Sequence, residues 1–207
     1  IAQVRDDSGK VIRYEYLNNV RKIAATGNFV YALKNDGTVW SWGRNDCGQL
    51  GLGTEYTYYT RVPYATQVIR GLQGSVSYRG ENAYMQEIVD IAVGGVDNDH
   101  GYAYMLQTTY YYHYTEIKDE EGNVTEAYTE PKMLTDNLFG VGDNTYGELS
   151  ISTITKQYRE PVSVHIANGV VAAVAGGESG TGHILVGNGS VINMGDNRYY
   201  GIGNGSS

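Results

Sequence analysis

The sequence contains little cysteine, proline or cationic charge. Of its 207 residues, one is cysteine, three are proline and 15 are lysine or arginine, against 23 aspartate or glutamate residues. Because Cys47 has no second thiol, we expect no internal disulfide, and packing must hold the fold together. The formal net charge of −8 argues against nucleic acid as a partner, because a phosphate backbone requires clustered cations.

The sequence also lacks any run of 18 apolar residues, so we predict no membrane insertion. Its first residue is Ile1, with no initiator methionine and no signal peptide, which indicates a processed chain or an excised piece. Glycine, by contrast, is abundant at 28 residues, about twice the average usage. With so little proline beside it, this glycine predicts the tight turns of an all-β repeat protein rather than a flexible linker.

Three segments, 39–51, 138–150 and 191–203, align without gaps. Apolar residues fill the first, second and fourth positions, followed by Gly-x-Asn and a return to leucine or isoleucine, a pattern that predicts a strand, a tight turn and the next strand. In the third copy, Tyr200 stands where the later glycine belongs. The turn positions shared by the copies are Gly43, Asn45, Gly48, Gly142, Asn144, Gly147, Gly195 and Asn197.

Trp40 and Trp42 occupy apolar columns of this alignment, where the second copy has Phe139 and Val141. We therefore assign both tryptophans to the core rather than to a ligand platform.

Two hairpin turns occur in the same register in the first and third copies. Segments 35–37 (Asn-Asp-Gly) and 187–189 (Gly-Asn-Gly) accept the positive φ that a two-residue turn demands. Without insertions the unit is about 50 residues long, which suits a four-stranded blade rather than a helical repeat. Two insertions interrupt the pattern, one within Glu55–Glu87 and the other within Thr108–Thr135.

Segments Ile23–Gly27, Leu33–Gly37 and Val39–Gly51 together resemble a repeat of the regulator of chromosome condensation family. The resemblance implies a β-propeller, usually of seven blades with circular closure. Because seven units need about 350 residues and this chain has 207, we predict an all-β propeller arc of about three to four blades with long hairpin insertions. The expected divisions are 1–19 (the end of a preceding blade, or a hairpin), 20–87 (repeat one with an insertion), 88–169 (repeat two with a tyrosine-rich hairpin) and 170–207 (repeat three, truncated).

An arc has two open ends with apolar faces. We expect more chain, another subunit or a differently folded cap to cover them, so that the partner is a protein or a second copy bound through the open ends. Upstream of repeat one, segment Val4–Val11 resembles segment Ile117–Val124 in the second insertion, and both predict hairpin tips.

Several possible chemistries fail on context. Segment Gly48–Gly53 is not the opening of a helix, as a dinucleotide fingerprint requires. Segment Asp97–Gly101 lacks the distal bidentate glutamate of a calcium loop, which favours a solvated turn. No histidine or cysteine pair has metal-ligand spacing, and His183 suits structural hydrogen bonding. We expect no metal, no cofactor and no catalytic residues.

The most informative feature is a tyrosine-rich hairpin followed by an acidic tip. Tyrosine supplies large, rigid contact area, so the stretch predicts a binding surface. The alternative, that these rings cover the edge of a decorated blade, stays open because cross-strand aromatic pairs also stabilise hairpins. The candidate binding residues are Tyr110, Tyr111, Tyr112, His113 and Tyr114, with a second group at Tyr56, Tyr58 and Tyr59.

These patterns predict a non-catalytic protein-interaction or assembly module of a propeller protein. The acidic, lysine-poor, tyrosine-rich composition favours the surface of a bacterium or secretion from it, with the cytoplasm as the open alternative. Other functions left open are a structural subunit that assembles into a ring or filament, guanine-nucleotide exchange or enzyme inhibition, and glycan binding through the tyrosines.

Overall fold

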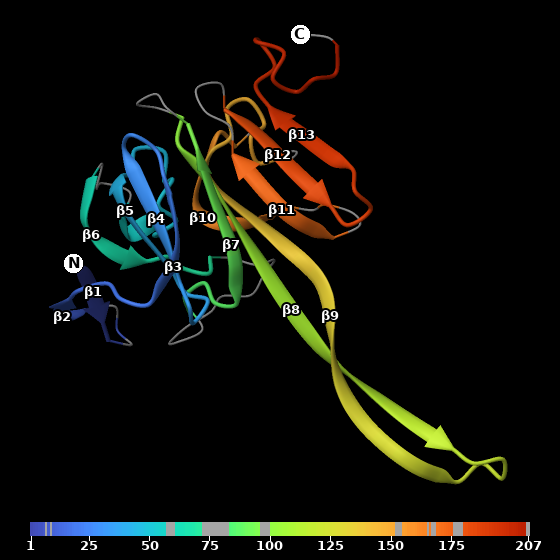
Figure 1. The fold of residues 1–207 in the computed structure, drawn as a ribbon. Helices are drawn as coiled ribbons and strands as arrows, with labels where there is room; N and C mark the ends of the chain where they lie inside the picture. Colours follow the sequence, from blue (N-terminus) through green and yellow to red (C-terminus); the bar gives the residue numbers. More distant parts are fainter. Residues whose placement is uncertain are drawn as a thin grey trace.

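The computed structural model describes residues 1–6, 8, 10–56, 61–71, 83–95, 100–151, 155–164, 166, 169–175 and 180–205, and only the backbone of 55, 109–114, 129–136 and 174. The regular structure in these parts is β-strand, apart from one 3-10 turn, η1 (Thr54–Tyr56). The strands form three sheets in chain order (Figure 1). The prediction of an all-β fold is confirmed. Among the described residues, no helix has the length and apolarity needed to cross a membrane.

Sheet one contains repeat one. Its antiparallel strands are β3 (Val20–Ala25), β4 (Phe29–Lys34), β5 (Val39–Arg44) and β6 (Arg61–Gln67). The turn between β4 and β5 is closed by the Asp36 carboxylate, which accepts the backbone N–H of Thr38 at 3.0 Å. Gly37 follows with φ +78°, a conformation that L side chains rarely adopt. The predicted hairpin turn is therefore confirmed.

The first residues form a hairpin that extends sheet one. Strands β1 (Ala2–Arg5) and β2 (Val11–Glu15) pair with each other, and β1 lies parallel to β6 with Ala2 opposite Ala65. The resulting strand order is β2-β1-β6-β5-β4-β3. Residues 1–19, expected as the end of a preceding blade or as a hairpin, thus lie on the outer edge of repeat one.

Sheet two contains the long hairpin. Its strands are β7 (Ile88–Gly94), β8 (Tyr102–Lys118), β9 (Val124–Asp143) and β10 (Gln157–Val164), in the order β10-β9-β8-β7. Strand β7 pairs with β8 only as far as Gln107, whereas the β8–β9 ladder continues to Lys118 opposite Val124. Beyond residue 107 the two strands leave the body of the protein as a twisted ribbon (Figure 1). The predicted hairpin insertion is confirmed.

Sheet three has three described strands, β11 (Val170–Ala175), β12 (Thr181–Val186) and β13 (Val191–Gly195), in chain order. Its hairpin turn has Gly189 at φ +84°, and the Val186 N–H donates to the Ser190 carbonyl at 2.9 Å. The inner strands of the three sheets begin at Val20, Ile88 and Val170, where the sequence places the starts of its repeats.

Two hydrophobic cores lie between successive sheets. The first joins Phe29 and Leu33 of sheet one to Met105 and Phe139 of sheet two. The second joins Leu106 of sheet two to Ile184 and Met194 of sheet three. Each fully buried side chain of this size stabilises the fold by about 1.5–3 kcal/mol, so face-to-face packing is the main force that holds the repeats together.

Candidate functional site

The most regular polar feature is a tight turn that follows the third strand of each repeat. In every copy the asparagine side-chain oxygen accepts the backbone N–H five residues later. Asn45 accepts from Leu50 at 3.2 Å, Asn144 from Leu149 at 2.9 Å, and Asn197 from Ile202 at 3.0 Å. The repeated asparagine is therefore the residue that closes each turn.

The glycine two positions before each asparagine is required by space and by conformation. Its φ is +107° at Gly43, +101° at Gly142 and +96° at Gly195. A Cβ added at these positions would lie 2.5, 2.3 and 2.1 Å, respectively, from a backbone carbonyl oxygen in the loop that precedes the second strand of the same repeat. At the later turn position, Gly48 and Gly147 have φ +78° and +81°, and Tyr200 adopts the same region at +61°. Tyr200 thus preserves the turn conformation, although its Cβ makes a positive φ energetically unfavourable.

In repeats one and two, one side chain at the end of the turn lies against the next repeat. Gln49 accepts the Cys47 N–H at 2.9 Å, and Glu148 accepts the Tyr146 N–H at 2.9 Å through one carboxylate oxygen. Added Cβ atoms at Gly101 and Gly180, the facing glycines, would lie 2.9 Å from the Gln49 amide nitrogen and 2.9 Å from the Glu148 Oε1, respectively. Gln49 and Glu148 therefore occupy equivalent positions between successive repeats, the first with an amide group and the second with a carboxyl group.

The Glu148 carboxyl is fully buried, and its Oε1 has no hydrogen-bond partner among the described residues. Burial raises the pKa of Glu148 to about 7, and the nearby Asp143 charge adds to the rise. An unpaired buried carboxylate is costly, so the carboxyl keeps its proton to a higher pH than an exposed glutamate does.

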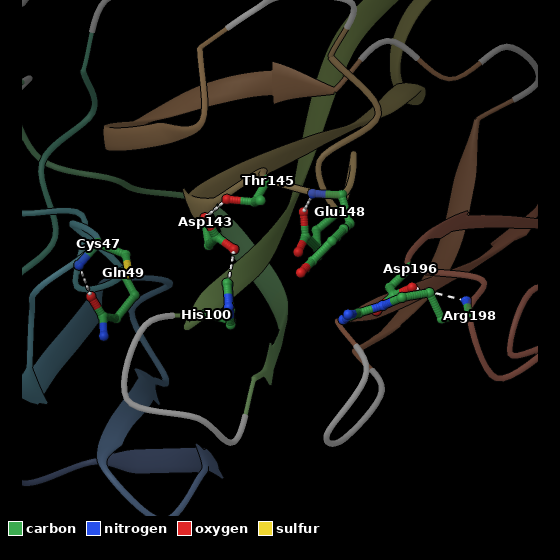
Figure 2. A network of polar contacts seen from close by, with 9 residues as sticks. Cys47, Gln49, His100, Asp143, Thr145, Glu148, Asp196 and Arg198 are labelled. Atoms are coloured by element: carbon green, nitrogen blue, oxygen red, sulfur yellow. Dashed lines mark hydrogen bonds and ion pairs between the residues drawn. The ribbon is translucent and has the colours of Figure 1, made fainter.

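Beside Glu148 lies a histidine–aspartate pair (Figure 2). His100 Nδ1 is 2.7 Å from a carboxylate oxygen of Asp143, whose side chain is almost fully buried. The Thr145 hydroxyl donates to the other Asp143 oxygen at 2.7 Å. These contacts connect the loop before β8 to the turn after β9, so they stabilise one end of repeat two.

The third repeat supplies a further ion pair at the same end of the sheets. Arg198 binds the buried Asp196 carboxylate at 2.6 Å, and this hydrogen-bonded pairing is the main reason that the pKa of Asp196 lies below its usual range. The Arg198 guanidinium also lies over the Tyr146 ring, 4.5 Å from its centroid. The network therefore joins repeat three to repeat two through a cation–π contact.

The sequence patterns did not predict this network. His100 and Asp143 are far apart in the chain, and the fold brings them together only because β8 and β9 are paired. Asp97, Asn98 and Asp99, considered above as a calcium-type loop, lie outside the described residues, as does His165. His183 hydrogen-bonds to Asn193 at 2.8 Å, the structural role expected for it. Among the described residues, no group of three metal-ligating side chains occurs.

The tyrosine-rich stretch lies on the projecting part of the β8–β9 hairpin. The backbone register pairs Tyr110 with Met133, Tyr112 with Pro131 and Tyr114 with Thr129. The side chains of the five candidates from Tyr110 to Tyr114 lie outside the described part. Beyond them, every residue from 116 to 128 is exposed. The hairpin therefore ends in a fully accessible tip.

The second tyrosine group is only partly described, because Tyr58 and Tyr59 lie outside the described residues. Tyr56 is half-buried, and its hydroxyl accepts a hydrogen bond from Arg5. Tyr64 of β6 contacts Tyr14 of β2, with ring centroids 5.0 Å apart. These tyrosines thus hold the N-terminal hairpin on the outer edge of repeat one.

Two apolar faces remain open at the ends of the sheet series. On repeat three, Leu185 is 37% and Val191 56% exposed, whereas their equivalents in repeat one, Leu33 and Val39, are fully buried. On repeat one, Ile23 is 64% exposed, whereas its equivalent Ile91 is 2% exposed. The inner strand of repeat one packs its Ala24 face on the core shared with sheet two, but no sheet among the described residues covers its Ile23 face.

The two tryptophans lie on this same open face of repeat one. Trp40 is buried with Ala2 and Ala65, and Trp42 packs beside them half-buried. A shallow hollow next to them is lined by apolar side chains, namely Ile1, Tyr16, Leu17, Val20, Ile23, Ala32, Trp42, Pro63 and Ala65. The tryptophans therefore pack at the margin of sheet one rather than between two sheets.

Comparison with known families and proteins gives a consistent result. Two family models described as Regulator of chromosome condensation (RCC1) repeat match residues 20–49 and 36–95. A human protein, "Probable E3 ubiquitin-protein ligase HERC6", is 27% identical over 187 residues, which cover 88% of this chain and 14% of that protein. This chain thus spans about a seventh of that relative's length.

Solved structures share the fold. Human WBSCR16 matches with a TM-score of 0.53 at 21% identity, over 90% of this chain and 36% of that one. Yeast RCC1 (Prp20), in a complex with Kap60, matches with a TM-score of 0.56 at 17% identity, over 92% of this chain and 35% of that one. A second structure, of Prp20p from Saccharomyces cerevisiae, matches with a TM-score of 0.55 at 17% identity, over 92% of this chain and 36% of that one. That structure concerns the binding of Prp20p to Gsp1p and histones. These proteins are β-propellers, so the three sheets have the arrangement of propeller blades.

Proposed function

Because the chain carries repeats of the regulator of chromosome condensation (RCC1) family, we propose that it is a non-catalytic protein-binding module whose β8–β9 hairpin contacts the partner. The observation that carries this proposal is the hairpin itself: a paired ribbon that continues past β7 and ends in a wholly exposed tip. The relatives support a protein as the ligand, since the yeast structures concern binding to Kap60, Gsp1p and histones.

Composition supports the hairpin as the contact. The projecting segment holds four tyrosines and one histidine at 110–114, and tyrosine is enriched at protein interfaces. Ile117, Val124 and Tyr128 of the tip are each more than two-fifths exposed. A short hairpin would complete sheet two equally well, so the extension serves contact outside the sheet.

Replacing residues 109–129 with a two-residue Asn-Gly turn tests this role. The full chain and the shortened chain are immobilised at equal density, and proteins retained from extracts of the source organism are compared by mass spectrometry. We expect at least one protein to be retained by the full chain alone, with both chains unfolding at similar temperatures. Identical sets of retained proteins would contradict the proposed role.

A second function, assembly through the open faces, is favoured by Leu185 and Val191, whose equivalents are buried in the other repeats. Exposed apolar side chains of this kind belong in an interface. Sedimentation velocity over a hundredfold concentration range tests it, with Val191→Glu as the disrupting variant and Val124→Glu on the hairpin as the matched control. We expect association that only Val191→Glu weakens, and a monomer at every concentration would contradict this second function.

We further propose display on a bacterial surface or secretion as the setting of this module. The support is composition alone: the chain is acidic, with a net charge of −8, and rich in tyrosine. Fractionation of the source cells checks it, and recovery of the protein only from the cytosol would contradict it.

A further inference from the structure

Two hairpin tips in this chain have the same architecture. The tip of β1–β2 and the tip of β8–β9 each contain 14 residues, 2–15 and 115–128, and the paired strand residues that the structure describes in them correspond one to one. Ala2 pairs with Glu15 as Thr115 pairs with Tyr128, and the register shifts after Val4 just as it does after Ile117. The resemblance predicted from sequence over 4–11 and 117–124 therefore extends to backbone pairing and to the position of a β-bulge.

The turns at the two tips are also equivalent. The Asp6 N–H donates to the Lys10 carbonyl at 3.0 Å, and the Asp119 N–H donates to the Asn123 carbonyl at 2.9 Å. Each aspartate carboxylate accepts the backbone N–H four residues later, at 3.0 Å and 2.8 Å, respectively. The Ser8 hydroxyl and then the Lys10 N–H lower the pKa of Asp6 below the usual range, and the Asn123 N–H is the main group that does so for Asp119. The same local chemistry thus builds both tips.

The surroundings of the two tips differ. The first tip is docked: β1 lies parallel to β6, and the Ala65 N–H donates to the Ile1 carbonyl at 3.0 Å. Two tyrosines flank this edge, Tyr64 against Tyr14 and Tyr56 against Arg5. Ala2 is 1% exposed as a result. The chain itself therefore shows how a tip of this architecture adds to the outer strand of a sheet.

The second tip has the same edge available. Strand β8 pairs with β7 only as far as Gln107, so the edge of β8 that faces away from β9 is unpaired over 115–118 within the described structure. Lys118 stands at the position equivalent to Arg5, the cation that contacts Tyr56 in the docked tip. The free tip thus presents both the backbone edge and the cation that the docked tip uses.

The two tips differ in charge, so they suit different receiving strands. The first tip is balanced, with Arg5, Lys10 and Arg13 against Asp6, Asp7 and Glu15. The second has a single cation, Lys118, against five acidic residues, namely Glu116, Asp119, Glu120, Glu121 and Glu126. Electrostatic complementarity therefore requires lysine or arginine beside the strand that receives the second tip.

We propose that residues 115–128 form a strand-adding element. Its Thr115–Lys118 edge pairs in parallel with the outer strand of a β-sheet in a partner protein, and that strand is flanked by tyrosine and by lysine or arginine. Main-chain hydrogen bonds supply the contact, and the flanking side chains select the edge. This inference rests on the proposed function, in which the hairpin binds a protein, and it adds the mode of binding.

The first test uses β6 as the receiving strand. Residues 2–15 of the full chain are replaced with the sequence of 115–128, and exchange of the Ala65 amide hydrogen is followed by NMR, with the buried Tyr31 amide as reference. The matched control carries proline at the position of Glu116 in the transplanted tip, because proline cannot donate to a strand ladder. We expect the Ala65 amide to exchange at least about tenfold more slowly in the swap than in the control. Equal exchange in the two would overturn the proposal.

The second test leaves the N-terminal hairpin intact and also decides the matter if the swapped chain does not fold. Glu116→Pro and Glu116→Thr are compared in the full chain, since threonine keeps the backbone N–H that proline lacks. We expect the protein captured through residues 109–129 to be lost with Glu116→Pro and kept with Glu116→Thr. If both variants capture the protein, or if neither does, strand addition is overturned. The proposed function is judged separately, by the truncation of residues 109–129. A Glu116→Pro-sensitive dimer in the absence of any partner would identify a second copy as the occupant and also overturn the proposal.

Discussion

The turns that end repeats one and two share one geometry but differ in the side chain that each places against the next repeat. Gln49 lies against Gly101 with an amide, and Glu148 lies against Gly180 with an acid. The acid is buried with one unpartnered oxygen among the described residues. The repeat scaffold therefore accepts either an amide or an acid at this position, and the acid makes the second junction sensitive to pH.

The largest expected effect concerns what the two turns share. Gly43→Ala and Gly142→Ala should each lower the free energy of unfolding by about 3 kcal/mol or more, because positive φ and a close carbonyl oxygen act together. Gly122→Ala is the control: its φ is also positive, at +88°, but nothing lies within 4 Å, so we expect a loss of about 1 kcal/mol. Denaturant unfolding measures all three, and a Gly142→Ala variant as stable as Gly122→Ala would contradict the steric account.

The next largest loss of stability is expected on replacing the turn asparagines, and it should be similar in the two repeats. Asn45→Ala and Asn144→Ala leave the Leu50 and Leu149 backbone N–H groups, respectively, without their acceptors. Each variant should lose about 1–2 kcal/mol, the cost of an unsatisfied buried donor. The same unfolding measurement checks this, and losses below about 0.3 kcal/mol in both variants would show that water or a neighbouring group replaces the amide.

Glu148→Gln should remove the difference between the junctions. The folded-state pKa of about 7 lies above the usual value of 4.5, so the native state binds the proton more tightly than the unfolded chain does. Stability therefore falls as pH rises from about 4.5 to 7 and levels off above that range. We expect Glu148→Gln to stabilise the protein at pH 8 by roughly 1–3 kcal/mol, with little change near pH 4.5.

The reciprocal change, Gln49→Glu, should introduce the same pH dependence at the first junction. Thermal unfolding of both variants between pH 4.5 and pH 8 provides the measurement. A pH profile unchanged by Glu148→Gln would refute the assigned role of this carboxyl.

The smallest effect is expected at Arg198, whose side chain reaches from repeat three to the Tyr146 ring of repeat two. Arg198→Ala removes an ion pair and a cation–π contact, but the arginine side chain is largely exposed. We expect a small loss of stability that shrinks at high salt. Unfolding at low and high salt checks this, and a loss that does not depend on salt would indicate packing rather than charge.

Local features of this fold could be predicted from the sequence because the residues that carry them are close together in the chain. Gly43, Asn45 and Gly48 encode a turn by conformation and by one local hydrogen bond, and the acidic tip at 119–122 encodes its own hairpin. Even the displacement of glycine by Tyr200 was visible, and the structure places that residue at positive φ.

Contacts between distant segments could not be predicted in this way. The pairing of His100 with Asp143 depends on the β8–β9 ladder, and the seat of β1 on β6 depends on which strand lies outermost. The buried acid at Glu148 gave no signal either, because a glutamate in a turn is usually solvated. A comparison of Gln49 with Glu148 in the aligned repeats could have pointed to that site.

The claim that the β8–β9 hairpin is the binding element is tested most directly by amine-reactive cross-linking of the intact chain to the protein that it retains, read by mass spectrometry. Lys118 lies at the hairpin tip, and Lys22 and Lys34 lie on sheet one as internal references. We expect cross-links to the partner to concentrate at Lys118. Cross-links at Lys22 and Lys34 with none at Lys118 would contradict it.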